Sequence, residues 1–253
     1  MSYLETKNVN KRFGGIRALT DCNFAIEADK VTCVVGPNGA GKTTIFNVIT
    51  GFLKPDTGTV TFKGEDLSEL ARHTRVDRGI ARTFQNLRLF EELSVLDNVL
   101  VCLSDDGAND ALTAVFRPFH SNAVLRRKKD KAMSLLEEVG LAHKADSLAS
   151  DMSYGQKKLL CIARILATDA ELLLLDEPTS GLAAGALDAM VALIAQLKAS
   201  GKTLLVVEHN TRIVRQIADD VLFFHRGTLM AQGTPEAIIA DPKLAEIYFG
   251  EEH

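Results

Sequence analysis

The stretch that decides the fold is Gly36-Pro37-Asn38-Gly39-Ala40-Gly41-Lys42-Thr43. It follows the continuous apolar run Val31–Val35, which has the composition of a buried parallel strand. A helix is predicted to follow, from Thr43 to about Ile49. Glycines allow the backbone to wrap a phosphate with its N–H groups, and the N-terminus of a helix adds partial positive charge. The spacing G-x-x-x-x-G-K-T between a strand and a helix therefore predicts a phosphate-binding P-loop.

The side chains of this loop have separate expected roles. Lys42 should reach the β- and γ-phosphates of a nucleotide, Thr43 should coordinate Mg²⁺, and Thr44 could contact the α-phosphate. The alternative is a glycine-rich turn with a chance lysine, which the strand before the loop and the helix after it disfavour. Kinases, GTPases and motor proteins all use such a loop, so it does not by itself identify the function.

A second motif, Leu172–Leu175 followed by Asp176 and Glu177, has an apolar strand ending in two acids. Ligands of open α/β sheets gather at the carboxyl ends of the strands. We predict that Asp176 holds Mg²⁺ through water and that Glu177 polarises the attacking water. Charge is costly at the end of an apolar strand, which indicates a cation nearby. The alternative is a strand that simply ends in surface acids.

Composition narrows the class of protein. The chain has 253 residues, 46% of them hydrophobic, and a net charge of −4, which suits a globular protein with one large domain or a domain with a subdomain. This charge gives no bias toward nucleic acid, and the basic cluster Arg126–Lys129 is read as a solvated helix face or, alternatively, a contact surface. No signal peptide or apolar stretch of roughly 20 residues occurs, so we expect a soluble cytoplasmic protein unless a partner holds it to a membrane. Four scattered cysteines indicate a reducing compartment (Cys22, Cys33, Cys102, Cys161).

Strands and helices are predicted to alternate. Short strands are expected within residues 1–35, with further strands at 59–62, 172–175 and 204–207 and an amphipathic helix at 186–198, a pattern typical of a parallel α/β core. A hairpin around Arg226-Gly227 and a helical tail after Pro235 follow. From about Leu87 to Gly155 the pattern is helical, with a polar loop near 104–109, and indicates an inserted helical subdomain.

A third motif, Met152-Ser153-Tyr154-Gly155-Gln156, stands between the P-loop and the Asp-Glu pair, with Gly155 21 residues before Asp176. It resembles the L-S-G-G-Q signature of ABC ATPases, with methionine for leucine and tyrosine for the first glycine. Ser153 and the amides after it would open a helix and form a second anion-binding end. The alternative is an ordinary serine cap.

Other positions of the ABC ATPase pattern follow in order. Gln85 matches the Q-loop, which senses Mg²⁺ and water, and His209 matches the H-loop histidine, which contacts the γ-phosphate. Phe13 resembles the aromatic residue that stacks on adenine, where tyrosine is more usual. Taken singly, Gln85 could be a surface amide and Phe13 a core residue. Ser180 to Ala183 occupy the D-loop, where many members carry S-A-L-D; Ser180 is expected at an interface, and Ala183 is given no role.

The resemblance covers essentially residues 1–253 and implies one ABC ATPase domain that binds ATP and Mg²⁺. The implied fold is α/β: a P-loop NTPase core with a mostly parallel sheet and an N-terminal antiparallel β subdomain (about 1–86 and 156–253), and an inserted α-helical subdomain (about 87–155). The implied catalytic residues are Glu177, His209, Gln85 and Lys42, and the implied metal ligands are Thr43, Gln85 and Asp176. The residues expected to bind the nucleotide are Phe13, Gly36, Pro37, Asn38, Gly39, Ala40, Gly41, Lys42, Thr43, Thr44, Ser153, Gly155 and Gln156.

The resemblance also implies partners. Each ATP would lie between one subunit's P-loop and the signature segment of a second ATPase subunit, the same chain or a paralogue. The segments 47–52, 79–90 and 241–248, and a long insertion at about 104–127, resemble importers of branched-chain amino acids and related amides. Such importers imply two permeases, a solute-binding protein reached indirectly, and a position on the inner face of the membrane.

The permease contact is expected at about residues 86–99. Leu89, Phe90 and Leu93 would offer apolar contact there, or they would pack inside the helical subdomain. Two other functions stay open: the ATPase of an exporter or lipid-transport system, which shares every catalytic motif, and a soluble regulatory switch that binds ATP. The presence of Glu177 and His209 argues against the switch.

Overall fold

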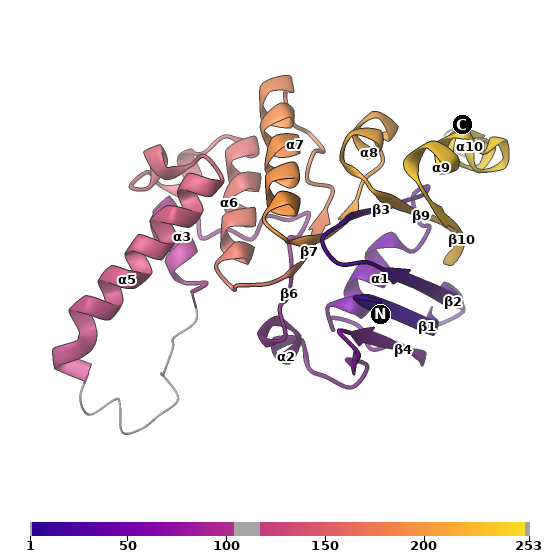
Figure 1. Cartoon of the computed structure of the whole chain (residues 1–253), viewed down its shortest axis with the longest axis horizontal. Helices are drawn as coiled ribbons and strands as arrows, with labels where there is room; N and C mark the ends of the chain where they lie inside the picture. Colours follow the sequence, from indigo (N-terminus) through magenta and orange to yellow (C-terminus); the bar gives the residue numbers. More distant parts are fainter. Residues whose placement is uncertain (1, 104–116, 251–253) are drawn as a thin grey trace. The chain divides into compact units, whose positions relative to one another are not determined.

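The computed structural model describes residues 2–103 and 117–250, with the side chains of 117–122 and 248–250 left aside. These residues form two compact units (Figure 1). The first comprises Met1–Gln85, Glu171–Ser180 and Asp188–His253, and the second comprises Asn86–Ala170 and Gly181–Leu187. The polar loop expected near 104–109, and the first part of the expected long insertion, lie outside the described residues.

The first unit contains an antiparallel sheet formed near the N-terminus, with strand order β2-β1-β4-β5. Its strands are β1 (Leu4–Phe13), β2 (Ile16–Ile26), β4 (Thr57–Phe62) and β5 (Glu65–Asp66). Strands were expected in this region, and the antiparallel β subdomain is confirmed. β1 and β2 are longer than the short strands expected, because register shifts between them let the pairing continue past local irregularities.

The second sheet of this unit has six strands in the order β10-β9-β3-β8-β7-β6. These are β3 (Val31–Val35), β6 (Ile80–Arg82), β7 (Leu172–Asp176), β8 (Thr203–Val207), β9 (Asp220–His225) and β10 (Thr228–Gly233). All neighbours are parallel except the hairpin pair β9–β10, so the mostly parallel α/β core is confirmed. β6 was not predicted, because three residues carry no readable periodicity.

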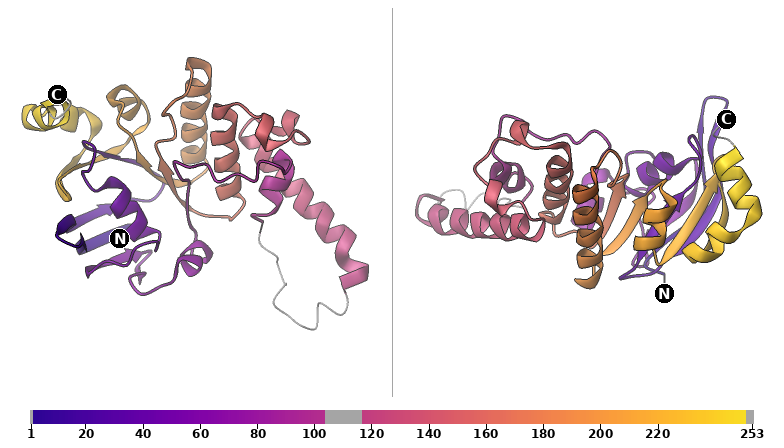
Figure 2. Two further views of the ribbon diagram at one scale, coloured as in Figure 1. Left: turned by 180° about the vertical axis from the view of Figure 1, so that it is seen from behind. Right: turned by 90° about the horizontal axis from the view of Figure 1, so that it is seen from above.

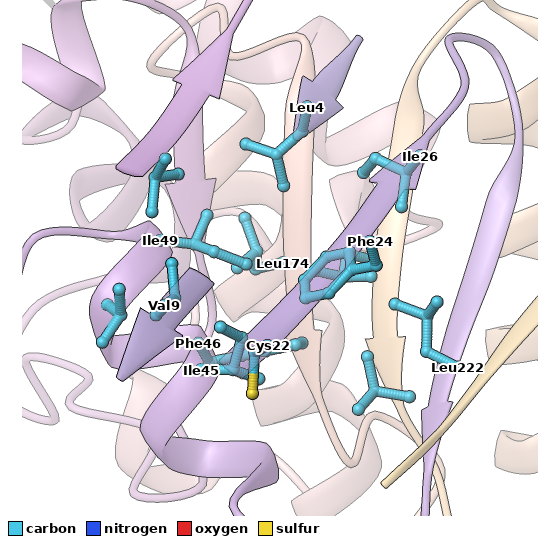
Figure 3. Close-up of a cluster of buried hydrophobic side chains, with 14 of the residues drawn as sticks. Leu4, Val9, Cys22, Phe24, Ile26, Ile45, Phe46, Ile49, Leu174 and Leu222 are labelled. Atoms are coloured by element: carbon cyan, nitrogen blue, oxygen red, sulfur yellow. The ribbon is translucent and has the colours of Figure 1, made fainter. Parts of the chain in front are cut away.

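Helices of the first unit cover the two faces of this sheet. They are α1 (Lys42–Ile49), α2 (Arg72–Asp77), most of α7 (Ala184–Ala199), α8 (Thr211–Ile217), α9 (Pro235–Ala240) and α10 (Pro242–Gly250). Leu222 and Phe224 of β9 join a core cluster that includes Phe46 of α1 and residues of both sheets (Figure 3). Val221 and Phe223, which alternate with them, line a pocket with residues of α8, α9 and α10. The ribbons of these helices lie beside the C-terminal strands of the sheet (Figure 2). α1 therefore packs against both sheets.

A buried arginine fixes the end of α1. Arg75 of α2 is 2% exposed, and its guanidinium donates to the carbonyl oxygens of Val48 (2.6 Å) and Ile49 (2.8 Å) in the last turn of α1. It also donates to the carbonyls of Leu67 (2.5 Å) and Leu70 (3.2 Å). The Val48 carbonyl also accepts from the Gly51 amide at 3.2 Å, whereas the Ile49 carbonyl at the helix end takes its donor from Arg75, so Arg75 anchors the helix that follows the P-loop.

The second unit is helical, with α3 (Val95–Leu100), α5 (Arg117–Glu138) and α6 (Tyr154–Leu166) packed against one another. Two short 3₁₀ segments, Ala142–Lys144 and Ala149–Asp151, join α5 to α6, and the first residues of α7 complete the unit. The sequence-based division placed residues 156–170 with the core, whereas these residues group with the second unit because α6 packs on α3 and α5. Within the described residues, no helix is long and apolar enough to cross a membrane.

Candidate functional site

The register of the parallel strands brings four polar segments of the first unit to one edge of the sheet. Val207 of β8 is level with Val34 of β3 and with Asp176 of β7, and Arg82 of β6 is level with Leu174. The carboxyl ends of these strands therefore share one edge, where open α/β sheets bind ligands. The segments that leave this edge are 36–43, 83–85, 176–177 and 208–210.

The P-loop depends on glycine at two positions. A Cβ on Gly36 (φ 146°) would lie 2.0 Å from the carbonyl oxygen of Phe224, and one on Gly41 (φ 101°) would lie 2.8 Å from that of Ala18. No other residue type fits these backbone conformations and close approaches. The Gly227 amide of the β9–β10 turn also donates to the Ala40 carbonyl at 3.0 Å, so neighbouring strands fix the curve of the loop.

Lys42 lies over the curve of this loop. Its ammonium donates to the carbonyl oxygens of Gly36 at 2.6 Å and Pro37 at 2.9 Å. Burial lowers the pKa of Lys42, while the nearby carboxylates of Glu177 and Asp176 oppose that shift. Because those two acids act on the ammonium, the lysine and the acidic pair share one electrostatic site.

Asp176 is buried at the end of β7, and one of its carboxylate oxygens is already engaged. Oδ2 accepts from Nη2 of Arg82 at 3.0 Å, so Arg82 is the nearby cation that the buried acid requires. Burial raises the pKa of Asp176 and the Arg82 charge opposes the rise. Oδ1 is one of two buried side-chain oxygens without a hydrogen-bond partner within the described part of the chain. An unsatisfied carboxylate oxygen at a ligand-binding edge fits the oxygen donors that Mg²⁺ prefers.

Glu177 follows with a strained backbone. Its φ is 49°, in the left-handed region that residues other than glycine rarely occupy, and its amide donates to the Val207 carbonyl at 3.0 Å. Such a conformation costs on the order of 1–3 kcal/mol and clusters at functional sites. The half-buried Glu177 side chain leaves the strand end at the same edge as Asp176.

The segment after β8 pairs a buried acid with an exposed histidine. Glu208 is 0% exposed, and its Oε1 accepts from the amide and the hydroxyl of Thr179 at 3.1 and 2.6 Å. His209 is exposed beside it, and the Asn210 side chain caps α8. Glu208 thus ties the segment after β7 to the segment after β8. Sequence reasoning did not find this role, although an acid ending an apolar run was a usable signal.

Gln85 and Phe13 are both accessible. Gln85 is exposed after the end of β6. Phe13 ends β1 with 47% of its surface exposed, and the Lys11 ammonium lies 5.9 Å from its ring centroid. The alternative that Phe13 is a core residue is therefore excluded, and the ring is available for stacking.

The signature segment of the second unit forms a capped helix start. Ser153 Oγ accepts from the Gln156 amide at 3.3 Å, and Gln156 Oε1 accepts from the Ser153 amide at 3.0 Å. A Cβ on Gly155 would lie 2.9 Å from the Cβ of Ala186, so only glycine allows this approach. Ser153 is thus the cap of α6, and the exposed Tyr154 is the first residue of that helix.

The proposed permease-contact segment leaves apolar surface uncovered. Phe90 is 51% exposed, with the Arg164 guanidinium 5.3 Å from its ring centroid, and Leu93 is 36% exposed. The buried Asn98 side chain donates to the Phe90 carbonyl at 2.9 Å and accepts from its amide at 3.0 Å. Asn98, which sequence reasoning missed, therefore shapes the loop that carries Phe90.

Comparisons with known proteins agree with this geometry. The sequence profile described as ABC transporter matches residues 19–180. The high-affinity branched-chain amino acid transport ATP-binding protein BraF of Pseudomonas aeruginosa is 37% identical over 249 residues, covering 98% of each chain. A nucleotide-free ATP-binding cassette from an ABC transporter is 34% identical, with a TM-score of 0.86 over 99% of this chain and 100% of that chain.

A more distant solved structure shows an ATP-binding cassette as a dimer in a post-hydrolysis state bound to ADP and Pi. It is 25% identical, with a TM-score of 0.76, and covers 92% of this chain and 98% of that chain. The family profile spans more than half of the chain, and the relatives match it over nearly its whole length. The chain therefore belongs to the ABC transporter family and is an ATP-binding cassette ATPase.

Proposed function

We propose that the chain is the ATP-hydrolysing motor of an importer for branched-chain amino acids or related polar amino acids and amides. The observation that carries the ATPase assignment is the meeting of the P-loop, Asp176, Glu177 and His209 at one sheet edge. The cargo class rests on the full-length similarity to BraF and on the subfamily-like segments described above.

Different residues at this edge bind different parts of ATP. Phe13 offers an aromatic face to the adenine, and Gly36–Gly41 present backbone amides to the phosphates while Lys42 neutralises their charge. Thr44 lies at the start of α1, where it would contact the α-phosphate. Positioned charges of this kind supply most of the rate acceleration in phosphoryl transfer.

Thr43, Asp176 and Gln85 would hold Mg²⁺, and the unsatisfied Oδ1 of Asp176 supports this assignment. When bound, Mg²⁺ neutralises charge on the β- and γ-phosphates. Glu177 orients the attacking water and takes its proton, and His209 holds the γ-phosphate. These roles make Glu177 the general base of the hydrolysis.

A second ATPase subunit, the same chain or a paralogue, completes each site with its Ser153–Gln156 segment. The dimeric cassette with ADP and Pi supports this arrangement. The whole span 1–253 then works as one ABC ATPase domain. It docks on membrane permeases at the inner face of the membrane, using the half-buried Leu89 and the exposed Phe90 and Leu93 side chains, and it serves a solute-binding protein indirectly.

The test compares Mg²⁺-dependent ATP turnover of the purified chain with that of Glu177→Gln. We expect the variant to lose about 100- to 10,000-fold in turnover, the usual contribution of a general base, and to accumulate as an ATP-bound dimer in light scattering. The control is Glu171→Gln at the start of β7, an exposed acid paired with Lys63 at 2.6 Å, which should keep wild-type turnover. Equal turnover in wild type and Glu177→Gln would overturn the general-base role of Glu177, and ATP binding by the wild type with no turnover even beside its permeases would indicate a regulatory switch.

A further inference from the structure

Arg82, the last residue of β6, has no assigned role in the proposed mechanism, yet it touches several parts of the site. It is 8% exposed. Its guanidinium donates through Nη2 to Asp176 Oδ2 at 3.0 Å and through Nη1 to Asn47 Oδ1 at 2.6 Å. Nε donates to the carbonyl of Thr83 at 3.2 Å. One planar group is therefore bound to β7, to α1 and to the segment that leads to Gln85.

Aromatic rings confine this guanidinium further. Its central carbon lies 4.7 Å from the ring centroid of Phe84 and 5.7 Å from those of Phe46 and Phe52. Arginine can combine a fork of donors with stacking on rings, and lysine cannot reproduce this geometry. The guanidinium therefore holds one orientation, and the Asp176 carboxylate bound to it has little freedom to rotate.

The two oxygens of Asp176 consequently differ. Oδ2 is committed to Arg82, while Oδ1 is buried and lacks a hydrogen-bond partner within residues 2–103 and 117–250. The Asp176 amide also donates to the Thr83 hydroxyl at 3.1 Å, so Arg82 and the residue after it fix both the side chain and the backbone of the acid. A carboxylate held in this way presents a single oxygen to a ligand.

A purely stabilising role accounts poorly for this arrangement. Buried ion pairs often contribute little net stability compared with apolar residues of similar volume, because both charges lose their hydration. Residues that hydrogen-bond to a metal ligand instead orient it, and their loss typically weakens metal affinity or activity. This pattern matches the contacts of Arg82.

We propose that Arg82 is a positioning residue, which turns Oδ1 of Asp176 toward the divalent cation that accompanies the nucleotide and couples that oxygen to α1 and to the Gln85 segment. The inference rests on the proposed function, since it requires a metal–nucleotide complex at this edge. Arg82 touches neither the nucleotide nor the water in this proposal, and it acts only through Asp176.

The test measures metal binding rather than turnover. Mn²⁺ replaces Mg²⁺, and free Mn²⁺ is followed by electron paramagnetic resonance in the presence of the full chain and ADP. In Arg82→Met we expect Mn²⁺ affinity to fall about 10- to 100-fold, while affinity for ADP without metal changes less than about twofold. Arg82→Lys, which keeps the charge but loses the fork, should be intermediate.

Two further variants make the result specific. Asn47→Ala removes the second anchor of the guanidinium and should weaken Mn²⁺ binding less than Arg82→Met does. Arg78→Met removes an exposed arginine paired with Glu65 at 2.9 Å and should leave Mn²⁺ binding unchanged. If Arg82→Met does not fold, Arg82→Lys and Asn47→Ala still decide the question, because both keep the burial pattern.

Wild-type Mn²⁺ affinity in the Arg82 and Asn47 variants would overturn the proposal. An equal loss of metal-free ADP affinity in Arg82→Met would also overturn it, since the residue would then support the fold of the whole site. A wild-type chain that binds ADP without recruiting Mn²⁺ would contradict the proposed function itself, a result distinct from either of these.

Discussion

Removing the buried arginine of α2 should destabilise the first unit strongly. Arg75 donates to four carbonyl oxygens, and Arg75→Met would fill its volume without donating to any of them. The Val48 carbonyl would keep the Gly51 amide at 3.2 Å, and the Leu67 carbonyl would keep the Leu70 amide at 3.0 Å. The loss therefore falls mainly on the carbonyls of Ile49 and Leu70. At about 1–3 kcal/mol for each buried group left unsatisfied, the free energy of unfolding should fall by about 2–6 kcal/mol.

The assay is thermal unfolding followed by circular dichroism. In a chain of this size about 1 kcal/mol corresponds to roughly 2–4 °C, so Arg75→Met should lower Tm by about 10 °C. The control is the exposed arginine of the same region: Arg78→Met breaks a surface ion pair worth about 0–1 kcal/mol and should shift Tm by no more than about 4 °C. Equal Tm shifts in the two variants would falsify the argument that Arg75 completes the end of α1.

Three further predictions concern accessible groups. Phe13→Ala should weaken ATP binding by about 1–3 kcal/mol, the usual value of a base–aromatic stack, and Phe13→Trp should restore it in a fluorescent-nucleotide titration; unchanged affinity would remove the ring from the site. Phe90→Ala should lower transport in reconstituted vesicles while basal ATPase activity stays at the wild-type level, whereas equal loss of both would contradict a permease-docking role for the ring. Burial raises the pKa of Cys22 to about 11 and of Cys161 to about 12, so a thiol reagent at pH 8 should modify Cys102 first in the native chain, and modification of all four thiols at one rate would contradict the burial.

The nucleotide edge was largely predictable because of how parallel strands are built. β3, β7 and β8 are buried on both faces, so each is a continuous apolar run, and the polar residue that ends the run marks the carboxyl edge of the sheet. β6 lacks this signal, since it has three residues and one of them is Arg82. β6 pairs with β7, with Ile80 level with Leu172, about 90 positions later in the sequence. The local sequence around β6 does not reveal so distant a contact.

The contacts of the supporting polar residues were not predictable, although the position of Glu208 after an apolar run was a usable signal. Arg75, Asn98 and Glu208 are buried, although arginine, asparagine and glutamate are mostly exposed in folded proteins. Their partners are backbone groups or hydroxyls of other segments, such as the Phe90 carbonyl for Asn98 and Thr179 for Glu208. Every residue has a backbone carbonyl, so the sequence does not show which carbonyls need a hydrogen-bond donor from a side chain.

Asp176 and Glu177 could be predicted as site residues because each is a residue type that its local structure disfavours. An apolar residue would suit the buried end of β7 better than Asp176, and glycine would suit the left-handed backbone at φ 49° better than Glu177. Such conflicts are expected where function decides the residue. Arg82 offsets the burial of Asp176 by donating to its carboxylate, and Glu208 accepts from Thr179 in the segment after β7. Both look like ordinary polar residues until the structure shows their partners. Sequence motifs therefore revealed Asp176 and Glu177 but not Arg82 and Glu208, which hold the neighbouring segments in place.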